Sequence, residues 1–254
     1  MIEVRHISKS FDGEQVLNDI SVSFEQGKTN LIIGKSGSGK TVLLKCIIGL
    51  HEVDQGEIYY SGNNFTAMNI MDKKKVRQKF GMLFQGGALF DSLTVEENVR
   101  FKLDMFTGMT TREKQERVDF CLKRVNLENK NDLYPAELSG GMKKRVAIAR
   151  AIVLNPRYLF CDEPNSGLDP QTAILIDKLI IEITEEFNMT TIVNTHDINS
   201  VMEMGDKVVY IDKGKKWWEG SNLDILNTDN EELNNFLFAN KMVRQLKNIN
   251  DSRQ

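Results

Sequence analysis

The sequence predicts an α/β fold with a mostly parallel sheet. Apolar, strand-like runs alternate with segments of helical periodicity, as where Thr29 to Ile33 is followed by Val42 to Leu50. Between these two segments lies Gly34 to Thr41, GKSGSGKT, which fits the phosphate-binding pattern G-x-x-x-x-G-K-[ST] at every specified position. A strand, a glycine-rich loop and a helix in this order are typical of nucleotide-binding α/β folds, so the remaining elements are expected to build on this unit.

Composition restricts the class of protein. The chain has 254 residues, of which 41% are hydrophobic, and a formal net charge of −3. This size suits one large domain or two small ones, and the charge argues against a nucleic-acid partner. Two basic runs, Lys73 to Lys75 and Lys143 to Arg145, are interpreted as solvated helix faces.

Cysteine usage and hydropathy indicate the cellular compartment in which the protein is expected. Cys46, Cys121 and Cys161 are widely spaced and each falls in an apolar or helical stretch, which is typical of buried thiols in a reducing compartment. The sequence contains no apolar run of about 18 residues, and its N-terminus has no apolar signal core. We therefore expect a cytoplasmic protein whose membrane role, if any, depends on a partner.

The N-terminal third predicts a small antiparallel β layer. Short β-like runs at Ile2 to Val4, Val16 to Leu17 and Ile20 to Phe24 are separated by turn residues. Gly56 to Tyr60 is predicted as a further strand of this layer. The first strands of this layer lead into the strand Thr29 to Ile33, which precedes the phosphate-binding loop.

The middle of the chain changes to helical character. A charged helix is predicted at Lys73 to Lys79, then a strand at Phe80 to Phe84. From about Val95 to Asn155 only helical periodicity is present, with a capping box formed by Thr110 and Glu113. This pattern indicates a helical subdomain inserted into the α/β fold.

Strands return in the last third, at Tyr158 to Cys161, Thr190 to Val193 and Lys207 to Ile211. Asp169 and Pro170 supply an N-cap and a first-turn proline for an intervening helix. The predicted domains are a nucleotide-binding core with its antiparallel β layer (1–84 and 156–221), a helical subdomain (85–155) and a helical tail (222–254).

The tail has its own pattern. Thr228 and Glu231 have the spacing of a capping box, followed by apolar residues at near-helical spacing. A helix packed on its own domain and a helix that contacts a second subunit both fit. The apolar positions are Leu233, Phe236, Leu237, Met242, Val243 and Leu246.

The glycine-rich loop predicts an ATP or GTP site. Its glycines allow the backbone N–H groups to turn onto phosphate oxygens, and the following helix start adds the positive end of its dipole. Lys40 is expected to reach the terminal phosphates and Thr41 to hold Mg²⁺. The loop residues expected around the phosphates are Gly34, Lys35, Ser36, Gly37, Ser38 and Gly39.

Two carboxylates end the apolar run at Tyr158 to Cys161. Asp162 is predicted to support Mg²⁺, and Glu163 to polarise an attacking water molecule. Two acids at a strand end are more often a helix cap or a solvated edge, but the phosphate-binding loop reverses that preference.

Two single polar residues follow predicted strands. Gln85 stands where the helical subdomain begins, so its amide could contact Mg²⁺ or the lytic water, and His196 could hydrogen-bond the γ-phosphate. Each alone is more often a structural polar residue. Asn194 to Asp197 imitates the guanine-reading pattern N-K-x-D but lacks its Lys, which favours ATP over GTP.

A second glycine-containing stretch, Leu138 to Met142 (LSGGM), opens a helix predicted at Lys143 to Val153 and exposes backbone N–H groups as a further anion site. The motifs taken together resemble the ATP-binding-cassette (ABC) transporter ATPases over residues 1 to about 220. They are, in order, GKSGSGKT, Gln85, LSGGM, Asp162–Glu163, Ser166–Asp169 and His196.

The resemblance implies a head-to-tail dimer in which ATP lies between the phosphate-binding loop of one subunit and the LSGGM stretch of the other. Ser139, Gly140, Gly141 and Asp169 are then nucleotide-binding residues. Phe11 matches the aromatic position on which the family stacks adenine.

The subgroup is predicted from Phe84 to Val99, FQGGALFDSLTVEENV. This run resembles the Mla-type ATPases, which power bacterial phospholipid transport for outer-membrane lipid asymmetry. The resemblance implies integral-membrane permease subunits, a lipid-binding mammalian-cell-entry subunit and a place on the cytoplasmic face of the inner membrane. The alternatives are an ABC ATPase of another importer or exporter, a non-transport ABC ATPase, and a nucleotide-sensing scaffold without catalysis.

Overall fold

The structure is a computed structural model that describes residues 1–237. These residues divide into two compact units. Unit 1 comprises residues 1–25, 29–67 and those from Asn194 onward, and unit 2 comprises residues 26–28 and 68–193. No helix of the described chain is long and apolar enough to cross a membrane.

Unit 1 contains the predicted antiparallel β layer. Its strand order is β2-β1-β4-β5, and Ile2 lies opposite Phe24 on one side and Tyr60 on the other. Three of the four strands are longer than the short β-like runs predict, and β2 joins two of these runs into one strand. The strands are β1 (Ile2–Phe11), β2 (Glu14–Phe24), β4 (Gln55–Tyr60) and β5 (Asn63–Asn64).

The other strands of unit 1 are β3 (Thr29–Ile33), β9 (Lys207–Asp212) and β10 (Lys215–Gly220). β3 is buried along its whole length and pairs with β9 in parallel, whereas β9 and β10 form an antiparallel hairpin. β10 is absent from the sequence-based prediction. Its residues are half-buried or exposed in alternation, so it lacks the apolar run that marks β3 and β9.

The helices of unit 1 are α1 (Lys40–Ile47), α7 (Ile198–Met204), α8 (Glu231–Leu237) and the 3₁₀ turn η2 (Ile225–Asn227). α1 begins two residues earlier than predicted and ends three residues earlier. Gly39 in the left-handed conformation turns the chain directly into the helix.

The predicted capping box of the tail is wrong. Asn230 caps α8 by accepting a hydrogen bond from the Leu233 backbone N–H at 2.8 Å, and the Thr228 hydroxyl accepts from the Asn230 N–H at 3.1 Å. Leu233 is buried, and the Phe236 ring lies 5.4 Å from that of Tyr210 on β9. The described part of the tail therefore packs on its own unit. Met242, Val243 and Leu246 lie outside the described residues.

Unit 2 contains β6 (Phe80–Leu83), β7 (Tyr158–Asp162) and the first part of β8 (Thr190–Thr195), whose last two residues belong to unit 1. The order is β8-β7-β6, and β6 pairs with β7 in parallel. This parallel pairing agrees with the mostly parallel sheet that the sequence predicts.

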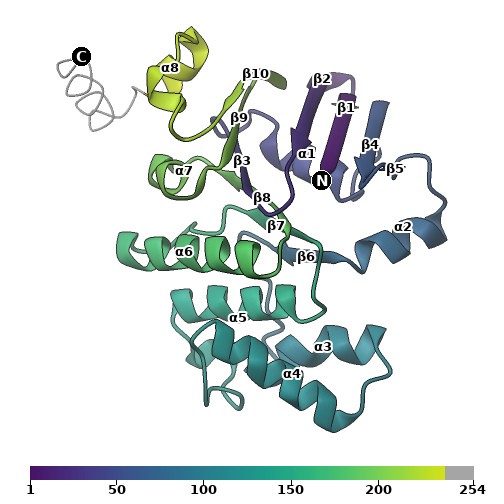
Figure 1. Cartoon of the computed structure of the whole chain (residues 1–254), viewed down its shortest axis with the longest axis vertical. Coiled ribbons are helices and arrows are strands. Elements are labelled where there is room, and N and C mark those ends of the chain that lie inside the picture. Colours follow the sequence, from purple (N-terminus) through teal and green to yellow (C-terminus); the bar gives the residue numbers. More distant parts are fainter. Residues whose placement is uncertain (238–254) are drawn as a thin grey trace. The chain divides into compact units, whose positions relative to one another are not determined.

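The helices of unit 2 include the predicted helical stretch (Figure 1). α3, α4 and α5 pack on one another, and α5 also packs on α6. Thr110 and Glu113 form the predicted capping box, and Thr94 and Glu97 form another at the start of α3. The helices are α2 (Ile70–Arg77), α3 (Val95–Phe106), α4 (Thr111–Arg124), the 3₁₀ turn η1 (Pro135–Glu137), α5 (Gly140–Ile152) and α6 (Pro170–Glu186).

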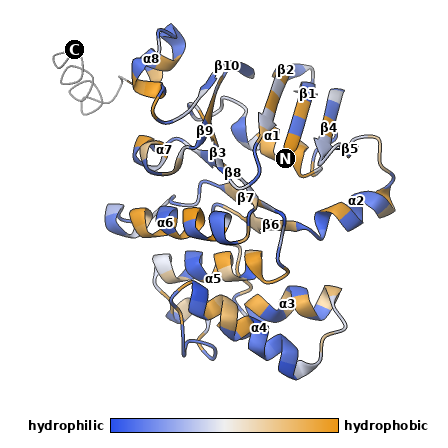
Figure 2. Ribbon diagram, in the orientation of Figure 1, coloured by the Kyte–Doolittle hydropathy of each residue, from blue (hydrophilic) through white to orange (hydrophobic). Residues whose placement is uncertain are grey.

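Amphipathic patterning explains how α6 packs. Hydrophobic and hydrophilic segments alternate along it (Figure 2), and Ile176, Ile180 and Ile183 are buried at helical spacing. The three cysteines are free and buried, as predicted. Burial raises the pKa of Cys46 and of Cys121 to about 11.

Candidate nucleotide-binding site

The phosphate-binding loop joins β3 to α1 in unit 1 and depends on glycine. Gly34 has φ of 153°, and a Cβ there would lie 2.0 Å from the Ile211 carbonyl oxygen, so no side chain fits. Gly37 and Gly39 have φ of 78° and 104°. The loop therefore takes a path that only glycine allows at these positions.

Polar groups of the loop point to an anionic ligand. The Lys40 ammonium is buried and donates hydrogen bonds to the carbonyls of Gly34 at 2.9 Å and Lys35 at 3.0 Å. The Ser38 hydroxyl is buried and has no hydrogen-bond partner within residues 1–237. α1 has no side-chain cap on its first turn. A cation, an unpaired hydroxyl and an uncapped helix start fit the phosphates of a nucleotide.

Phe11 ends β1 and is accessible, with 38% of its surface exposed. Its ring meets His51 edge-on with 5.2 Å between ring centroids, and the Lys9 ammonium lies 5.2 Å from its centroid. Lys9 is held by Asp54 at 2.7 Å. The exposed ring can stack on a planar base, which remains a prediction.

The acidic residues end β7 in unit 2. Asp162 is the last residue of the strand, and Glu163, which follows, has φ of 49°. A left-handed glutamate is uncommon, and such outliers gather at functional sites because the surrounding structure has to hold them. The side chain of Gln85 donates to the Ser166 hydroxyl at 3.3 Å, so Gln85 reaches the segment that follows Glu163.

The LSGGM stretch starts α5. Ser139 is the N-cap and its hydroxyl accepts from the Met142 N–H at 3.3 Å. A Cβ on Gly141 would come within 2.5 Å of the Thr172 methyl group, so α5 approaches α6 closely there. Asp169 caps α6 by accepting from the N–H and hydroxyl of Thr172 at 3.0 and 2.6 Å. These bonds lower the pKa of Asp169.

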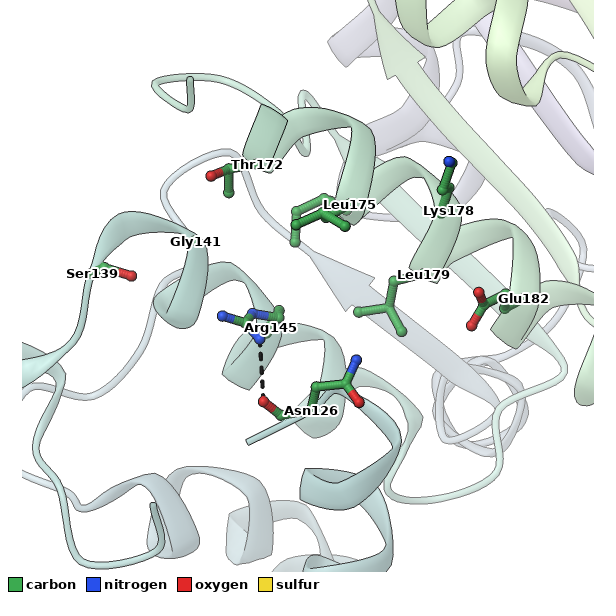
Figure 3. A pocket seen from close by; sticks show the side chains of 10 residues that line it. Asn126, Ser139, Gly141, Arg145, Thr172, Leu175, Lys178, Leu179 and Glu182 are labelled. Carbon is green, nitrogen blue, oxygen red and sulfur yellow. Dashed lines mark hydrogen bonds between the residues drawn. The ribbon is translucent and has the colours of Figure 1, made fainter. Parts of the chain in front are cut away.

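A pocket of about 230 Å³ lies beside this helix start (Figure 3). Arg145 projects along it and donates to the Asn126 carbonyl at 3.2 Å. Apolar side chains of α6 form the opposite wall. The lining residues are Asn126, Ser139, Gly141, Arg145, Thr172, Leu175, Ile176, Lys178, Leu179 and Glu182.

His196 follows the last residue of β8 and is exposed in unit 1, where Asp197 caps α7. The predicted residues thus fall into two groups. Unit 1 carries Phe11, the phosphate-binding loop and His196, and unit 2 carries Gln85, Ser139 to Gly141, Asp162, Glu163 and Asp169. Sequence reasoning did not single out Lys9 and His51, which lie beside Phe11. Lys9 lies two residues before Phe11 on β1, whereas His51 comes from the segment between α1 and β4, so no local pattern links it to Phe11.

A glycine-rich phosphate loop, an acidic strand end and a second glycine-containing helix start define a P-loop ATPase of the cassette class. Residues 17–166 match the model of the family described as ABC transporter, and the chain belongs to this family as an ATP-binding subunit and ATPase.

Relatives are found among import ATPases. The methionine import ATP-binding protein MetN of Clostridium tetani is 40% identical over 216 residues, which cover 85% of this chain and 67% of that protein. The glutamine transport ATP-binding protein GlnQ of Escherichia coli is 37% identical over 238 residues, covering 93% and 98%.

Solved structures agree with the fold. A dimeric post-hydrolysis state of the ATP-binding cassette MJ0796 bound to ADP and Pi has a TM-score of 0.79 at 31% identity, covering 87% of this chain and 99% of that one. The cbiO1 protein of Clostridium perfringens, part of the ABC transporter complex cbiONQ, has a TM-score of 0.84 at 28% identity, covering 97% and 98%. The predicted ABC-ATPase fold is confirmed.

Proposed function

We propose that this chain is the ATP-hydrolysing subunit of an importer of amino acids or similar small polar solutes. The observation that carries the proposal is its identity with amino-acid import ATPases, 40% to a methionine import protein and 37% to a glutamine transport protein. The second of these matches extends over nearly the whole of both chains. On this proposal the solute is selected by other subunits, and the chain supplies the energy.

The phospholipid prediction finds no support among these relatives. It rests on one short run, Phe84 to Val99, and on Met142 after LSGG, whereas the similarity to import ATPases extends over 85% or more of the chain. The mammalian-cell-entry partner is likewise unsupported. The importer, predicted as an alternative, fits better, and phospholipid transport becomes the competing outcome of the experiment below.

The residues of unit 1 suit the binding of ATP. Backbone N–H groups of the loop would surround the phosphates, Lys40 would neutralise their charge, and Ser38 would gain a partner for its buried hydroxyl. Phe11 would stack on the adenine. Mg²⁺ would neutralise charge on the β- and γ-phosphates, and Thr41, Gln85 and Asp162 are the residues with suitable oxygen atoms to hold it.

Residues that follow the ends of β6, β7 and β8 would carry out the hydrolytic step. Glu163 would orient the attacking water molecule, and His196 and Gln85 would contact the γ-phosphate side. Ser139, Gly140, Gly141 and Asp169 would complete the site of a second copy in a head-to-tail dimer. Such a dimer would work under a membrane permease, on the cytoplasmic face of the inner membrane.

Glu163→Gln tests the hydrolytic assignment. The amide keeps the shape of the side chain but loses the charge, so ATP binding should persist while turnover falls ~10²- to 10⁴-fold. Sizing in ATP and Mg²⁺ should then show a trapped dimer. Normal turnover by the variant would contradict the role of Glu163.

Transport tests the function itself. The chain is purified with the membrane subunits that it binds and reconstituted into proteoliposomes with trapped ATP. Uptake of labelled methionine and glutamine is measured beside transfer of a labelled phospholipid, with the Glu163→Gln complex as the inactive control. ATP-dependent amino-acid uptake supports the proposal. Phospholipid transfer without amino-acid uptake would restore the lipid alternative.

A further inference from the structure

The loop after β6, residues 84–90, is held by side chains of other elements rather than by a sheet or helix. We call it the Gln85 loop. Its carbonyl oxygens accept hydrogen bonds from two cationic side chains of α5: Lys144 donates to Gln85, and Arg150 donates to Gly87 at 2.7 Å and to Ala88 at 2.8 Å. All of these residues belong to unit 2.

The far end of the loop is fixed by α3. Asn98 is fully buried; its side-chain amide donates to the Phe90 carbonyl at 3.1 Å and its side-chain oxygen accepts from the Phe90 N–H at 2.9 Å. Within the loop itself the Gly87 N–H donates to the Phe84 carbonyl at 2.8 Å, and Ala88 has a left-handed φ of 48°. An alanine in this conformation stays there only where its surroundings impose it.

The two cations of α5 are buried although the groups they hold are neutral. Lys144 is 5% exposed and Arg150 is 8% exposed. Burial lowers the pKa of both side chains, which shows that their charges are desolvated. Apolar residues would fill the same space at less cost, so the charges are retained for their polar contacts. Both cations bond to the loop, Arg150 also lies 5.9 Å from the ring centroid of Phe90, and the Glu163 carboxylate acts on Lys144.

The same helix carries the LSGGM stretch. Ser139 caps α5, Lys144 and Arg150 lie within it, and the loop that they hold contains Gln85, whose side chain reaches Ser166. A helix is rigid over this length because each turn is hydrogen-bonded to the next. Any displacement of the first turn of α5 therefore moves the anchor points of the Gln85 loop.

We propose that Lys144 and Arg150 are positioning residues for ATP hydrolysis, which hold the Gln85 loop on α5 so that the Gln85 side chain is placed by the helix that carries Ser139. The inference rests on the proposed role of Gln85 in hydrolysis. It adds two residues that would act through the position of Gln85 rather than on the nucleotide itself.

Arg117 offers a matched control. It also donates to main-chain carbonyls, those of Val153 at 2.9 Å and Ile152 at 2.9 Å, but these acceptors belong to the C-terminal end of α5 and not to the Gln85 loop. Arg117→Met removes an arginine of α4 that bonds to main-chain carbonyls at the C-terminal end of α5. It separates a loss of general stability from a loss of loop position.

The test compares Arg150→Met, Lys144→Met, Arg150→Lys and Arg117→Met in steady-state ATP hydrolysis. Arg150→Met should lower kcat ~10- to 100-fold, as expected for a misplaced active-site group, and leave KM for ATP within about threefold. Arg150→Lys should recover part of the loss. Lys144→Met, which removes a single bond, keeps the test informative if Arg150→Met does not fold. Arg117→Met should lower the melting temperature without lowering kcat.

A double-mutant cycle with Gln85→Ala shows whether the effect passes through Gln85. Adding Arg150→Met to Gln85→Ala should cause no further loss of kcat. Amide hydrogen exchange across residues 84–90 should be faster in Arg150→Met and unchanged in Arg117→Met. Additive losses, or an Arg150→Met enzyme with normal kcat beside an impaired Gln85→Ala enzyme, would overturn the positioning role alone. A Gln85→Ala enzyme with normal kcat would overturn the proposed role of Gln85 and the positioning role with it.

Discussion

α1 follows a glycine-rich loop and α5 begins with two glycines, but the backbone amides of their first turns are satisfied differently. At α1 no side chain caps the first turn and Gly39 is left-handed. At α5 the Ser139 hydroxyl already accepts from the Met142 N–H at 3.3 Å. An uncapped start leaves its amides for a ligand, whereas a capped one offers fewer. The difference suits α1 to hold a phosphate chain by itself and α5 to complete a site formed mainly by another subunit.

The largest effect is expected from a variant that disrupts the phosphate-binding loop before α1. Lys40→Ala removes the buried cation of the phosphate-binding loop, so both ATP binding and hydrolysis should be lost, with turnover reduced ~10³-fold or more. Nucleotide affinity is measured by fluorescence of a labelled ATP analogue, with Lys45→Ala of the same helix as the control. Unchanged affinity in Lys40→Ala would remove the assignment of α1 as the main phosphate site.

A variant that blocks the start of α5 should lower ATP hydrolysis without lowering ATP binding. Ser139→Arg places a bulky side chain at the helix start, so ATP binding at the α1 loop should persist while turnover falls ~10²-fold. Mixed with Lys40→Ala subunits, it should regain part of its turnover, because one complete site can form in a mixed dimer. If the single variant hydrolyses ATP normally, α5 does not complete a site.

A smaller effect is expected on stability, and it should differ between two glycines of the phosphate-binding loop. Gly34→Ala would set a Cβ 2.0 Å from a backbone oxygen, whereas Gly37→Ala meets nothing within 4 Å and has only its φ of 78° to oppose it. The expected losses in free energy of unfolding are about 3 kcal/mol or more for the first and about 1 kcal/mol for the second. Urea titrations measure both, and equal losses would show that the close approach at Gly34 does not matter.

The smallest effect concerns the thiol of Cys46 on α1 and that of Cys121 on α4. Burial raises the pKa of each to about 11, so the reactive thiolate is nearly absent at neutral pH. Neither should react with a thiol reagent in the native protein at pH 7.5, and both should react in denaturant. The rate should rise as pH approaches 11 while the fold persists. Rapid labelling of Cys46 alone would show that the α1 region opens.

Much of this architecture could be predicted from local pattern. The phosphate loop, the strand that ends at Asp162 and the Thr110 capping box each depend on residues close together in the sequence, and each is present. β10 could not be predicted because Lys215 to Gly220 has no buried apolar side to reveal it. At Thr228 the spacing was correct for a capping box, but Asn230, a stronger cap nearer to the helix, takes the role.

The residues that hold the Gln85 loop show a second limit. Lys144 and Arg150 look like ordinary members of a basic helix, and their partners are main-chain carbonyls about 60 residues earlier. Every residue has a main-chain carbonyl, whatever its side chain. A sequence pattern therefore cannot show which carbonyls accept these bonds. The subgroup prediction is unsupported for a related reason, since the run from Phe84 to Val99 is short and the similarity to import ATPases extends over 85% of the chain.

The two bonds that Lys40 donates to the carbonyls of Gly34 and Lys35 hold its ammonium in place before any ligand binds. Hydrogen bonds from a charged donor contribute about 1.5–3 kcal/mol each, so this buried cation is kept in one position. On the proposal that the loop binds the phosphates of ATP, the positive charge would meet the ligand already placed. Little side-chain order would then have to be gained on binding.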